Sequence, residues 1–433
     1  MVEKISWYEE FVDFNYKPKE SDVICLFRLE PSKGMNLKEV IGRIASESSC
    51  GTWVTLSKLP SRINKLKAYA FWNKGKFLKV AYPLELFEEA SINSFLSGPA
   101  GNIFGMKAVN KLKLMDASFP IKFLKGFKGP NYGKDAIKKI FRRKRGPITA
   151  VVPKPKLGFS AREHAEIAYK IWIGGIDCIK DDENLSNQKF NRFADRVRLI
   201  SKFREKAEKV TGNVKEAFIN VTAQNLEEME KRIKLIHNYG FNYFMLDVVI
   251  SGFTAVGTAS ELAHDFNMAI HGHRAMHAMF TRHDHGMSML MLAKIMRILG
   301  IDQLHIGTVI GKLEGKKEEV LATKELITKE EVAEIPFLRL EQKWGKIKPM
   351  LPVASGGLHP GILPELFKLY GTTDIVIQVG GGTQGHPLGA EAGAKAVIQA
   401  IEAYHQGIEL EEYSKTHKEL RIALEKFGKV HPV

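Results

Sequence analysis

Cysteine is scarce in this chain of 433 residues, and long apolar runs are missing. The three cysteines, Cys25, Cys50 and Cys178, lack the close spacing of a metal site. No segment approaches the roughly 18 consecutive apolar residues that a membrane span needs. The N-terminal sequence MVEKISWYEEFVDF carries Glu and Asp where a signal peptide has an apolar run. We therefore expect a cytoplasmic protein that stays reduced and does not enter a membrane.

Acidic residues are outnumbered, because 64 Lys and Arg face 49 Asp and Glu and leave a formal charge of +15. Such an excess is typical of proteins that bind phosphate groups, in nucleic acids or in small molecules. The basic residues are mostly spread among acids, however, and only KKIFRRKRG (138–146) is a dense run. We interpret that run as a helix end and linker. A phosphorylated small molecule, and no nucleic acid, is the expected partner.

Internal repeats are also absent, so the organisation must be inferred from the order of expected helices and strands. The length exceeds what one hydrophobic core usually supports, which predicts two domains. In the first domain, residues 1–135, the segments 21–30 and 75–87 have strand patterns, and 36–48 repeats at helical spacing. These patterns predict an N-terminal α+β domain.

Residues 136–433 alternate apolar strand-like runs with amphipathic segments such as AREHAEIAYKIW (161–172). Eight βα units over roughly 290 residues predict a (β/α)8 TIM barrel of the α/β class, here with a C-terminal helical extension. Active sites of such barrels lie at the C-terminal ends of the strands. The eight expected strands are 148–153, 175–180, 217–221, 243–248, 268–272, 303–308, 350–355 and 374–379.

The stretch GGIDCIKDDENLS (174–186) places a lysine among three acids where the second strand ends. Side chains alternate along a strand, so Lys180 and Asp182 point to one side and Asp181 to the other, with Glu183 available at the bend. Two carboxylates suit Mg²⁺, whereas a free ammonium would repel it. Reaction of the amine with carbon dioxide would convert it into an anionic carbamate ligand. The alternative is a plain salt bridge between Lys180 and Asp182.

Two further basic motifs follow expected strands. VPKPKLG holds Lys154 and Lys156 close together, which can poise one amine for proton transfer, although a surface turn is the alternative. HGHRAMHAMF holds His271, His273 and Arg274. A His-x-His pair binds metal in amidohydrolase barrels, but there it precedes the lysine. The reversed order favours acid–base and phosphate-binding roles here.

Glycine-rich loops follow the sixth and eighth strands. GGGTQG (380–385) matches a dinucleotide motif in spacing, but no further strand with an acidic end follows it, so we expect only a phosphate contact through its backbone and the next helix. GTVIGK (307–312) is not a P-loop, because its first gap is too short. Its glycines suggest a hinged loop carrying Lys312, with an ordinary exposed loop as the alternative.

These motifs together resemble the large subunit of ribulose-1,5-bisphosphate carboxylase/oxygenase (RuBisCO), most closely the archaeal form III. The resemblance covers nearly the whole chain. It implies carbamylation of Lys180 by activating CO2, Mg²⁺ binding by Lys180, Asp182 and Glu183, and proton transfer by Lys154 and His273. The motifs that carry it are ESSCGTW (47–53), GNIFGMK (101–107), KPKLG, GGIDCIKDDEN, HGHRAMHA, HIGTVIGKLEG, LPVASGGLHPG and QVGGGTQGHPLG.

The resemblance also implies a substrate site that two subunits share, and hence a homodimer or a higher oligomer of dimers. Lys156 would hold the reaction intermediate, and Lys312 would close over the incoming gas. The other residues expected to contact substrate are Arg274 and His305 at one phosphate, Gly357, Gly380 and Gly381 at the other, Ser355 at the sugar hydroxyls, with Gly356 and Gln378, and Glu47, Thr52, Trp53 and Asn102 from a neighbouring subunit.

The activity that the resemblance implies is addition of CO2 and water to ribulose-1,5-bisphosphate, giving two molecules of 3-phosphoglycerate, with a side reaction with O2 and a place in AMP salvage. Val152 and Ile306 stand where plant-type enzymes have threonine and serine, which bears on fine specificity. The alternative is a RuBisCO-like enolase or isomerase of sulfur salvage, although such proteins typically lose several of these residues. A nucleic-acid-binding role would depend on charge alone.

Lys312 separates these alternatives. Enolisation needs only a metal, phosphate contacts and a base, whereas addition of CO2 builds a carboxylate whose charge an overlying ammonium would stabilise in the transition state. We expect Lys312→Ala to lose phosphoglycerate formation by roughly a hundredfold to a thousandfold and to keep exchange of the C3 proton with solvent. Radiolabelled CO2 incorporation and tritium exchange measure the two steps. Equal loss of both, or loss of neither, would contradict this role.

Overall fold

The computed structural model describes residues 7–52, 54, 60–143, 146–310 and 316–431. Its internal contacts divide the chain into two compact units, which are described separately. The first comprises Met1–Gly129 together with two later segments, Met276–Leu299 and Lys329–Ile347. The second comprises Pro130–Ala275, Gly300–Thr328 and Lys348–Val433. The domain boundary near residue 135 stays a prediction.

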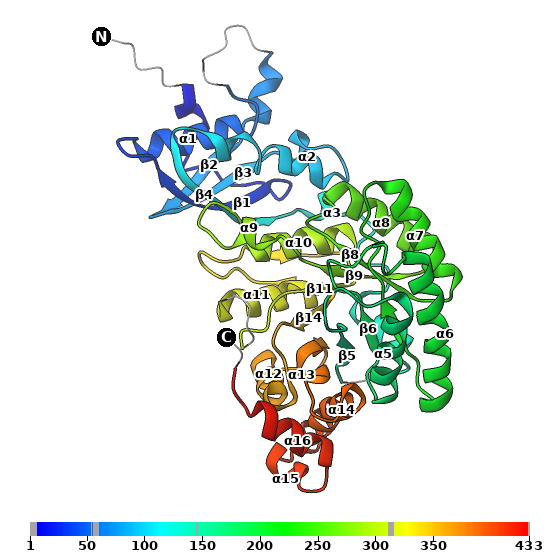
Figure 1. Cartoon of the computed structure of the whole chain (residues 1–433). Helices are drawn as coiled ribbons and strands as arrows, with labels where there is room; N and C mark the ends of the chain where they lie inside the picture. Colours follow the sequence, from blue (N-terminus) through cyan, green and yellow to red (C-terminus); the bar gives the residue numbers. More distant parts are fainter. Residues whose placement is uncertain (1–6, 53, 55–59, 144–145, 311–315, 432–433) are drawn as a thin grey trace. The chain divides into compact units, whose positions relative to one another are not determined.

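The first unit is built on a five-stranded mixed sheet in the order β10-β4-β1-β3-β2 (Figure 1). Strand β1 is antiparallel to β3 and β4, and β2 is antiparallel to β3. The strand and helix patterns expected at 21–30, 36–48 and 75–87 correspond to β1, α1 and β3. The unit's elements are η1 (Trp7–Phe11), β1 (Val23–Pro31), α1 (Leu37–Glu47), η2 (Ser61–Leu66), β2 (Tyr69–Lys74), β3 (Phe77–Tyr82), η3 (Leu84–Leu86), α2 (Ile92–Ser97), η4 (Asn102–Gly105), β4 (Val109–Ser118), α3 (Ile121–Leu124), α9 (Ala278–Thr281), β10 (Gly286–Met287), α10 (Met289–Leu299), β12 (Glu331–Val332) and β13 (Gln342–Lys343).

Two segments from the second half of the chain are integral to this first unit. Strand β10 extends the sheet by pairing in parallel with β4. In α10, the Lys294 ammonium lies 2.6 Å from the Asp116 carboxylate of β4, and both side chains are fully buried. The backbone N–H of Leu340 donates to the other oxygen of Asp116 at 2.8 Å. One buried carboxylate therefore joins three separate stretches of sequence.

The second unit is the predicted barrel. Its eight parallel strands are hydrogen-bonded in the order β7-β6-β5-β15-β14-β11-β9-β8. The ring closes between β7 and β8, where Val221 N–H donates to the Met245 carbonyl at 2.9 Å and Met245 N–H donates to the Ile219 carbonyl at 2.8 Å. The strands are β5 (Ile148–Val151), β6 (Cys178–Lys180), β7 (Glu216–Phe218), β8 (Tyr243–Asp247), β9 (Ala269–His273), β11 (Gln303–His305), β14 (Leu351–Ser355) and β15 (Val376–Gln378), one within each predicted segment or overlapping it.

Helices surround these strands and begin and end at residues typical of helix termini (Figure 1). A capping box of Ser160 and Glu163 starts α5, and the left-handed Gly212 ends α6. The helices of this unit are α4 (Gly133–Ile140), α5 (Ala161–Ile173), α6 (Phe193–Thr211), α7 (Leu226–Asn238), α8 (Phe253–Asp265), α11 (Lys317–Thr328), η5 (Pro360–Ile362), α12 (Leu363–Tyr370), α13 (Gly380–Gln384), α14 (Ala390–Gln406), α15 (Leu410–Ser414) and α16 (Lys418–Phe427).

The barrel core is continuous from the strands to α4. The strands are buried along nearly their whole length, as expected of parallel strands covered by helices. Ile137 and Phe141, from α4 and its C-terminal cap, belong to the same apolar cluster as Ile148 and Val376, which begin β5 and β15. Because α4 covers the N-terminal ends of the strands, the opposite ends are left to hold polar side chains.

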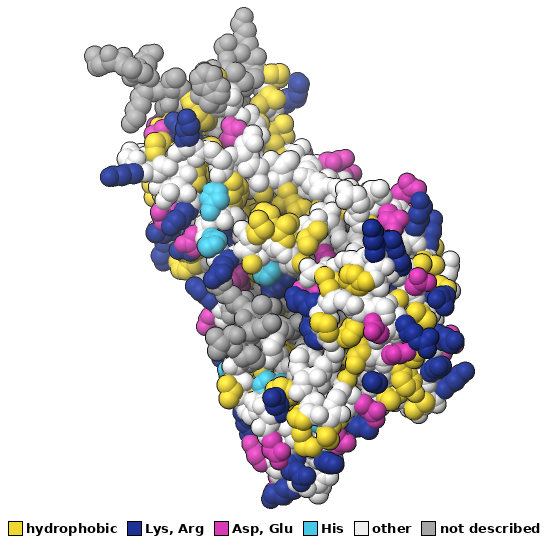
Figure 2. Space-filling model, viewed as in Figure 1, with side chains coloured by type: hydrophobic (Ala, Val, Ile, Leu, Met, Phe, Trp, Pro, Cys, Tyr) yellow, Lys and Arg dark blue, Asp and Glu magenta, His cyan; other side chains and the backbone are white. Residues whose placement is uncertain are grey.

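The positive charge is distributed among ion pairs on the helices. Figure 2 shows basic and acidic side chains side by side over α6 and α7, where Lys231 lies 2.7 Å from Glu227. In the dense basic run, Arg143 lies 2.6 Å from Asp177, and Lys138 pairs with Asp374. Residues 144 and 145 of that run lie outside the described residues. The described part of the run is thus engaged within the barrel unit.

Two expectations from composition can be compared with the structure. Within the described ranges, no helix is both long enough and apolar enough to cross a membrane. The cysteines are free thiols, with Cys25 and Cys178 buried and Cys50 half-buried. Burial raises the pKa of all three thiols, so they are poor nucleophiles at neutral pH.

The Asp116–Lys294 pair generates a stability prediction. Lys294→Met should lower the free energy of unfolding by about 3–5 kcal/mol, because it leaves a buried carboxylate without its counter-charge. Adding Asp116→Asn should recover part of that loss, since it removes the unpaired charge and its one amide oxygen still accepts one of the two backbone N–H groups. Chemical denaturation of wild type, single and double variants measures this. A single variant as stable as wild type would show that the pair is dispensable.

Candidate active site at the C-terminal ends of the barrel strands

The structure brings the predicted polar residues of the barrel to one end of it. Lys180, His273 and His305 are the last residues of β6, β9 and β11. Ser355 and Gln378 end β14 and β15. Because all these strands are parallel, their carboxyl ends form one rim. The remaining predicted barrel residues follow after the strands: Lys154, Lys156, Asp182, Glu183, Arg274, Gly356 and Gly357 in loops, and Gly380 and Gly381 at the start of α13.

Lys180 is buried at the base of this rim, with a relative exposure of 1%. Its ammonium donates to the backbone carbonyl of Asp181 at 2.8 Å. Burial lowers the pKa of Lys180 below the ordinary lysine value, although the charges of Glu183 and Asp247 oppose the shift. A larger fraction of this amine is therefore neutral near pH 8 than for a surface lysine, and a neutral amine is the form that attacks carbon dioxide.

Two carboxylates follow Lys180, and each lies beside an ammonium group. Asp182 accepts from Lys154 Nζ at 3.0 Å, and Glu183 accepts from Lys156 Nζ at 3.3 Å. Burial raises the pKa of both carboxyls, but hydrogen bonds to Asp182 and nearby positive charge at Glu183 outweigh it and hold both pKa values below the ordinary range. Both groups therefore stay ionised, as metal ligands must.

Asp181 points away from the rim, as the strand alternation predicts. Its Oδ2 accepts from Arg196 Nε of α6 at 3.1 Å and from the backbone N–H of Asn220 at 3.0 Å. His164 Nε2 of α5 lies 3.4 Å from Oδ1. Asp181 thus fastens the segment that carries Lys180 to the surrounding helices, and its carboxylate is unavailable to a ligand at the rim.

His273 is oriented by a carboxylate that the sequence analysis did not identify. Its Nδ1 lies 3.0 Å from Asp247 Oδ1, and its Nε2 lies 3.7 Å from Glu183 Oε2. The Ala275 N–H also approaches Nδ1, at 3.3 Å, but the contact with Asp247 is shorter and a carboxylate can only accept, so we assign the proton to Nδ1 and leave Nε2 as a base. Burial and the charge of Lys180 lower the pKa of His273, while Asp247 raises it. The position of Asp247 at the end of β8 is the signal that could have revealed it.

Arg274 and His305 provide positive charge and a polar ring deep in the rim. Both are nearly buried. Burial lowers the pKa of Arg274 to about 10, so the guanidinium remains charged at neutral pH. Among the described residues, no carboxylate lies within ion-pair distance of it. The charge of Glu319 reaches Arg274 only from beyond that distance, so the buried guanidinium can pair directly with an anionic ligand.

The glycine-rich loops bring backbone close to the rim. Gly356 and Gly357 have φ values of +110° and +78°, which favour glycine. A Cβ at Gly380 would lie 3.1 Å from the Val152 carbonyl, whereas nothing lies within 4 Å of one at Gly381. Among the described residues, the space beside Gly381 is therefore open, so a ligand such as a phosphate can approach the backbone there.

Gln384 ties this glycine segment to the first strand loop. Its side-chain oxygen accepts from Lys154 N–H at 2.7 Å, and its nitrogen donates to the Lys154 carbonyl at 2.9 Å. The sequence analysis missed Gln384, since only the folded chain shows which backbone a glutamine pairs with.

The donor set fits Mg²⁺ only in part. Asp182 and Glu183 supply hard oxygen ligands, and each already attracts a cation, Lys154 or Lys156. Within the described residues, no three His, Cys, Asp or Glu side chains are grouped so as to hold a metal. A third anionic ligand would have to come from Lys180 after reaction with carbon dioxide, and its position directly before the two carboxylates is compatible with this.

Several predicted residues cannot be placed at this rim. Trp53 and Lys312 lie outside the described residues. Glu47 ends α1, Asn102 begins η4, and Thr52 lines a cavity of about 210 Å³ with Cys50 and Lys67. All of these described residues belong to the first unit. Their contribution to a site on a barrel stays a prediction.

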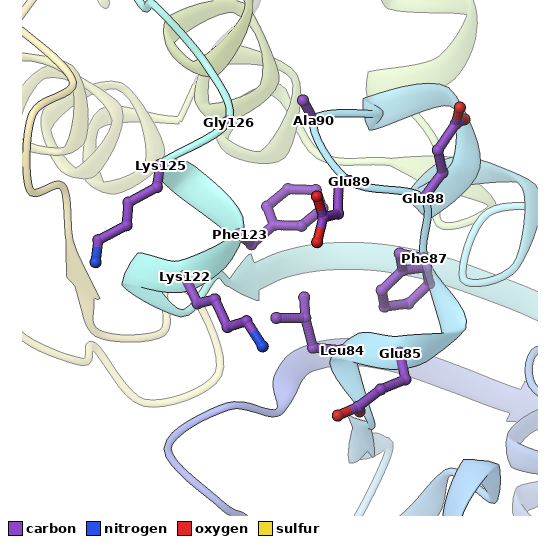
Figure 3. Close-up of a pocket in the computed structure, with 10 residues that line it drawn as sticks. All are labelled: Leu84, Glu85, Phe87, Glu88, Glu89, Ala90, Lys122, Phe123, Lys125 and Gly126. Atoms are coloured by element: carbon purple, nitrogen blue, oxygen red, sulfur yellow. The ribbon is translucent and has the colours of Figure 1, made fainter.

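A second cavity of the first unit, of about 360 Å³, has no predicted residue in its wall (Figure 3). The Glu89 carboxylate lies beside the Phe123 ring, and the Lys122 ammonium points toward Leu84, whereas Lys125 points away. Its lining mixes acidic, basic and apolar side chains, which selects no single class of ligand.

Comparison with known proteins places this geometry in a family. Residues 134–427 match the family "Ribulose bisphosphate carboxylase large chain, catalytic domain", and residues 10–123 match its N-terminal domain. The chain is 46% identical to ribulose bisphosphate carboxylase of Pyrococcus abyssi over 434 residues, covering 99% of both chains. It is 47% identical to that of Archaeoglobus fulgidus over 437 residues, covering 98% of this chain and 99% of the other.

Solved structures of archaeal RuBisCO are similar to this chain in both fold and sequence. The dimeric archaeal RuBisCO of Hyperthermus butylicus superimposes with a TM-score of 0.93 at 48% identity, covering 98% of this chain and 100% of that one. The octameric enzyme of Pyrococcus horikoshii gives a TM-score of 0.91 at 46% identity, covering 98% of each chain. With both of its domains matched and archaeal relatives aligned over nearly its full length, this chain belongs to the ribulose bisphosphate carboxylase large-chain family.

Proposed function

We propose that this enzyme is a carboxy-lyase that adds CO2 and water to ribulose-1,5-bisphosphate and releases two molecules of 3-phosphoglycerate. The observation that carries the proposal is the placement of Lys180, a buried amine of lowered pKa that precedes the ionised carboxylates of Asp182 and Glu183 by two and three residues. That arrangement suits a lysine that reacts with carbon dioxide and then, with Asp182 and Glu183, holds Mg²⁺. The family to which the chain belongs supports the same reaction.

Two anion sites on the rim would hold the bisphosphate. We assign one phosphate to Arg274 and His305, because the buried guanidinium lacks a carboxylate partner among the described residues. We assign the other to Gly357, Gly380 and Gly381, whose backbone a phosphate can approach closely. Ser355, Gly356 and Gln378 would contact the part of the sugar between the two phosphates.

The protein's own side chains would then move protons. The carbamate of Lys180 would take the C3 proton of the bisphosphate, and His273 Nε2 and the Lys154 amine would transfer the later protons. Mg²⁺, when bound, would stabilise negative charge on substrate oxygens as a Lewis acid. Lys156 would hold the carboxylated intermediate, and Lys312 would approach the added carboxylate.

The setting of the reaction follows from the resemblance to archaeal form III enzymes. We propose a homodimer or a higher oligomer, which the dimeric and octameric relatives support. We also propose a side reaction with O2, a cytoplasmic location, a role in AMP salvage and a domain boundary near residue 135. A RuBisCO-like enolase of sulfur salvage is the second candidate; retention of all the principal barrel residues argues against it.

The proposed function predicts that the enzyme must be activated by carbon dioxide and Mg²⁺. Preincubation with bicarbonate and Mg²⁺ should raise incorporation of radiolabelled bicarbonate into phosphoglycerate, because an unmodified Lys180 leaves only two anionic ligands. Lys180→Ala should abolish this incorporation, and intact mass should show a carbamate on wild type only. Undiminished carboxylation by Lys180→Ala would contradict the proposal.

Shared active sites are the second prediction. Glu47→Gln and Lys180→Ala subunits, each inactive alone, should regain activity on mixing, because a hybrid dimer can hold one site with neither change. Asp182→Asn, a change on the same barrel as Lys180, serves as a matched control: it should be inactive alone and should restore no activity to Lys180→Ala, because every barrel of the hybrid then carries a change. Inactivity of hybrids whose formation is verified by mass would exclude a site shared in this way.

Asp247 provides a pH-dependent prediction. Its charge raises the pKa of His273, so Asp247→Asn should lower that pKa further and move the acidic limb of the kcat/KM profile to lower pH. The maximal rate should fall by roughly a hundredfold as the imidazole loses its orientation. An acidic limb that stays in place, with an undiminished rate, would mean that His273 does not act as the base.

A further inference from the structure

A row of buried polar side chains inside the barrel leads to His305 and includes residues to which the proposed mechanism gives no task. His271, in β9, is fully buried, and its ring stacks on Phe218 with 4.2 Å between centroids. Its Nδ1 lies 2.8 Å from the Gln303 carboxamide, which in turn lies 3.0 Å from the Tyr243 hydroxyl. Its Nε2 lies 3.0 Å from His305 Nε2.

Both imidazoles of this row are neutral. Burial lowers the pKa values of His271 and His305 well below the ordinary histidine value. Each neutral ring has one N–H and one acceptor nitrogen. Since the two Nε2 atoms face each other, one must donate and the other must accept, so the tautomer of His271 fixes that of His305.

Two hydrogen-bond patterns are possible along the row. In the first, His271 Nδ1 donates to Gln303, so His271 Nε2 accepts from His305 Nε2–H. His305 Nδ1 is then a lone pair. The Gln378 nitrogen also lies 3.0 Å from His271 Nε2, so two donors would compete for one acceptor, and the buried Gln378 oxygen has no partner.

The second pattern follows when both carboxamides turn by 180°. The Tyr243 hydroxyl donates to Gln303 oxygen, and the Gln303 nitrogen donates to His271 Nδ1. His271 Nε2–H then faces two acceptors, His305 Nε2 and the Gln378 oxygen, which can share it. Both nitrogens of His271 and the hydroxyl of Tyr243 then have hydrogen-bond partners. The NH2 group of the Gln378 carboxamide is the one group of the row without a partner in this pattern.

The substrate decides between the two patterns. This inference rests on the proposed function, in which His305 meets a phosphate of the bisphosphate. His305 Nε2 is occupied by His271, so only Nδ1 remains for a ligand. A phosphate oxygen is attracted by an N–H at that atom and repelled by a lone pair. The second pattern is the one that binds the anion.

We propose that His271 is a positioning residue for phosphate binding: held by Gln303 and Tyr243, it donates through Nε2 and thereby presents His305 with its proton on Nδ1. His271 does not touch the substrate in this scheme. Four barrel strands supply the row, β8, β9, β11 and β15, so the tautomer of one ligand-binding histidine depends on side chains buried beneath it.

Neutron crystallography of the full-length enzyme soaked with inorganic phosphate tests the protonation directly. We expect deuterium on His305 Nδ1 and on His271 Nε2. His386 is an internal standard, because its Nδ1 accepts from Leu388 N–H at 3.1 Å and its Nε2 lies 3.0 Å from the Glu419 carbonyl, which fixes deuterium on Nε2. Deuterium on His305 Nε2 with phosphate bound would overturn the proposal.

Kinetics of His271→Phe provide a second test. Phenylalanine keeps the stacking on Phe218 but removes both ring nitrogens. KM for the bisphosphate should rise by roughly tenfold to a hundredfold, the loss expected for one hydrogen bond to a charged group, while kcat changes less than threefold. Unchanged KM, or a fall in kcat alone, would contradict the proposal.

Gln303→Met covers the case in which His271→Phe does not fold. Methionine has a similar length but can neither donate nor accept at this position, so the His271 tautomer is no longer imposed. KM should rise in the same direction, by about tenfold or less. If wild type fixes CO2 but the protonation and both KM values disagree with this scheme, the inference fails alone. If wild type fixes no CO2, the proposed function itself fails.

Discussion

The exclusion of water from around Lys180 is the constraint on which the rest of the barrel site depends. An ammonium group is costly to bury. The closed ring of strands and the anchoring of Asp181 by Arg196 nevertheless hold the Lys180 side chain inside. Nearby carboxylates offset only part of that cost, and the amine is left with a lowered pKa. The same burial keeps the neighbouring imidazoles neutral and leaves Arg274 charged with no described carboxylate at ion-pair distance.

Two kinds of side chain result from this burial. Those on the rim form ion pairs with each other, Lys154 with Asp182 at 3.0 Å and Lys156 with Glu183 at 3.3 Å. Others, such as Asp247 and Gln384 at the strand ends and His271 beneath them, contact other protein groups and fix their orientation. These side chains lose little further conformational entropy when a substrate reacts, because the rigid barrel already fixed their orientation when the chain folded.

The sequence predicted the parts of this architecture that depend on local pattern. All eight barrel strands and the alternation around Lys180 could be identified, because hydrophobic periodicity and strand geometry act over a few residues. The side chains that orient the site histidines could not be predicted in this way. Asp247 and Gln303 each reside in a different strand from the histidine they contact, so their pairing exists only after the barrel closes. The roles of the rim residues came from resemblance rather than from pattern.

The sheet of the first unit has a consequence for how such a chain could be divided. Strand β4 would be an open edge without β10, which the chain supplies only after completing the fifth barrel strand. An exposed strand edge invites pairing with other molecules. An isolated N-terminal fragment would therefore be prone to aggregate, and recombination between relatives at a single crossover near residue 130 would unite a sheet with a foreign edge strand and a foreign partner for Asp116.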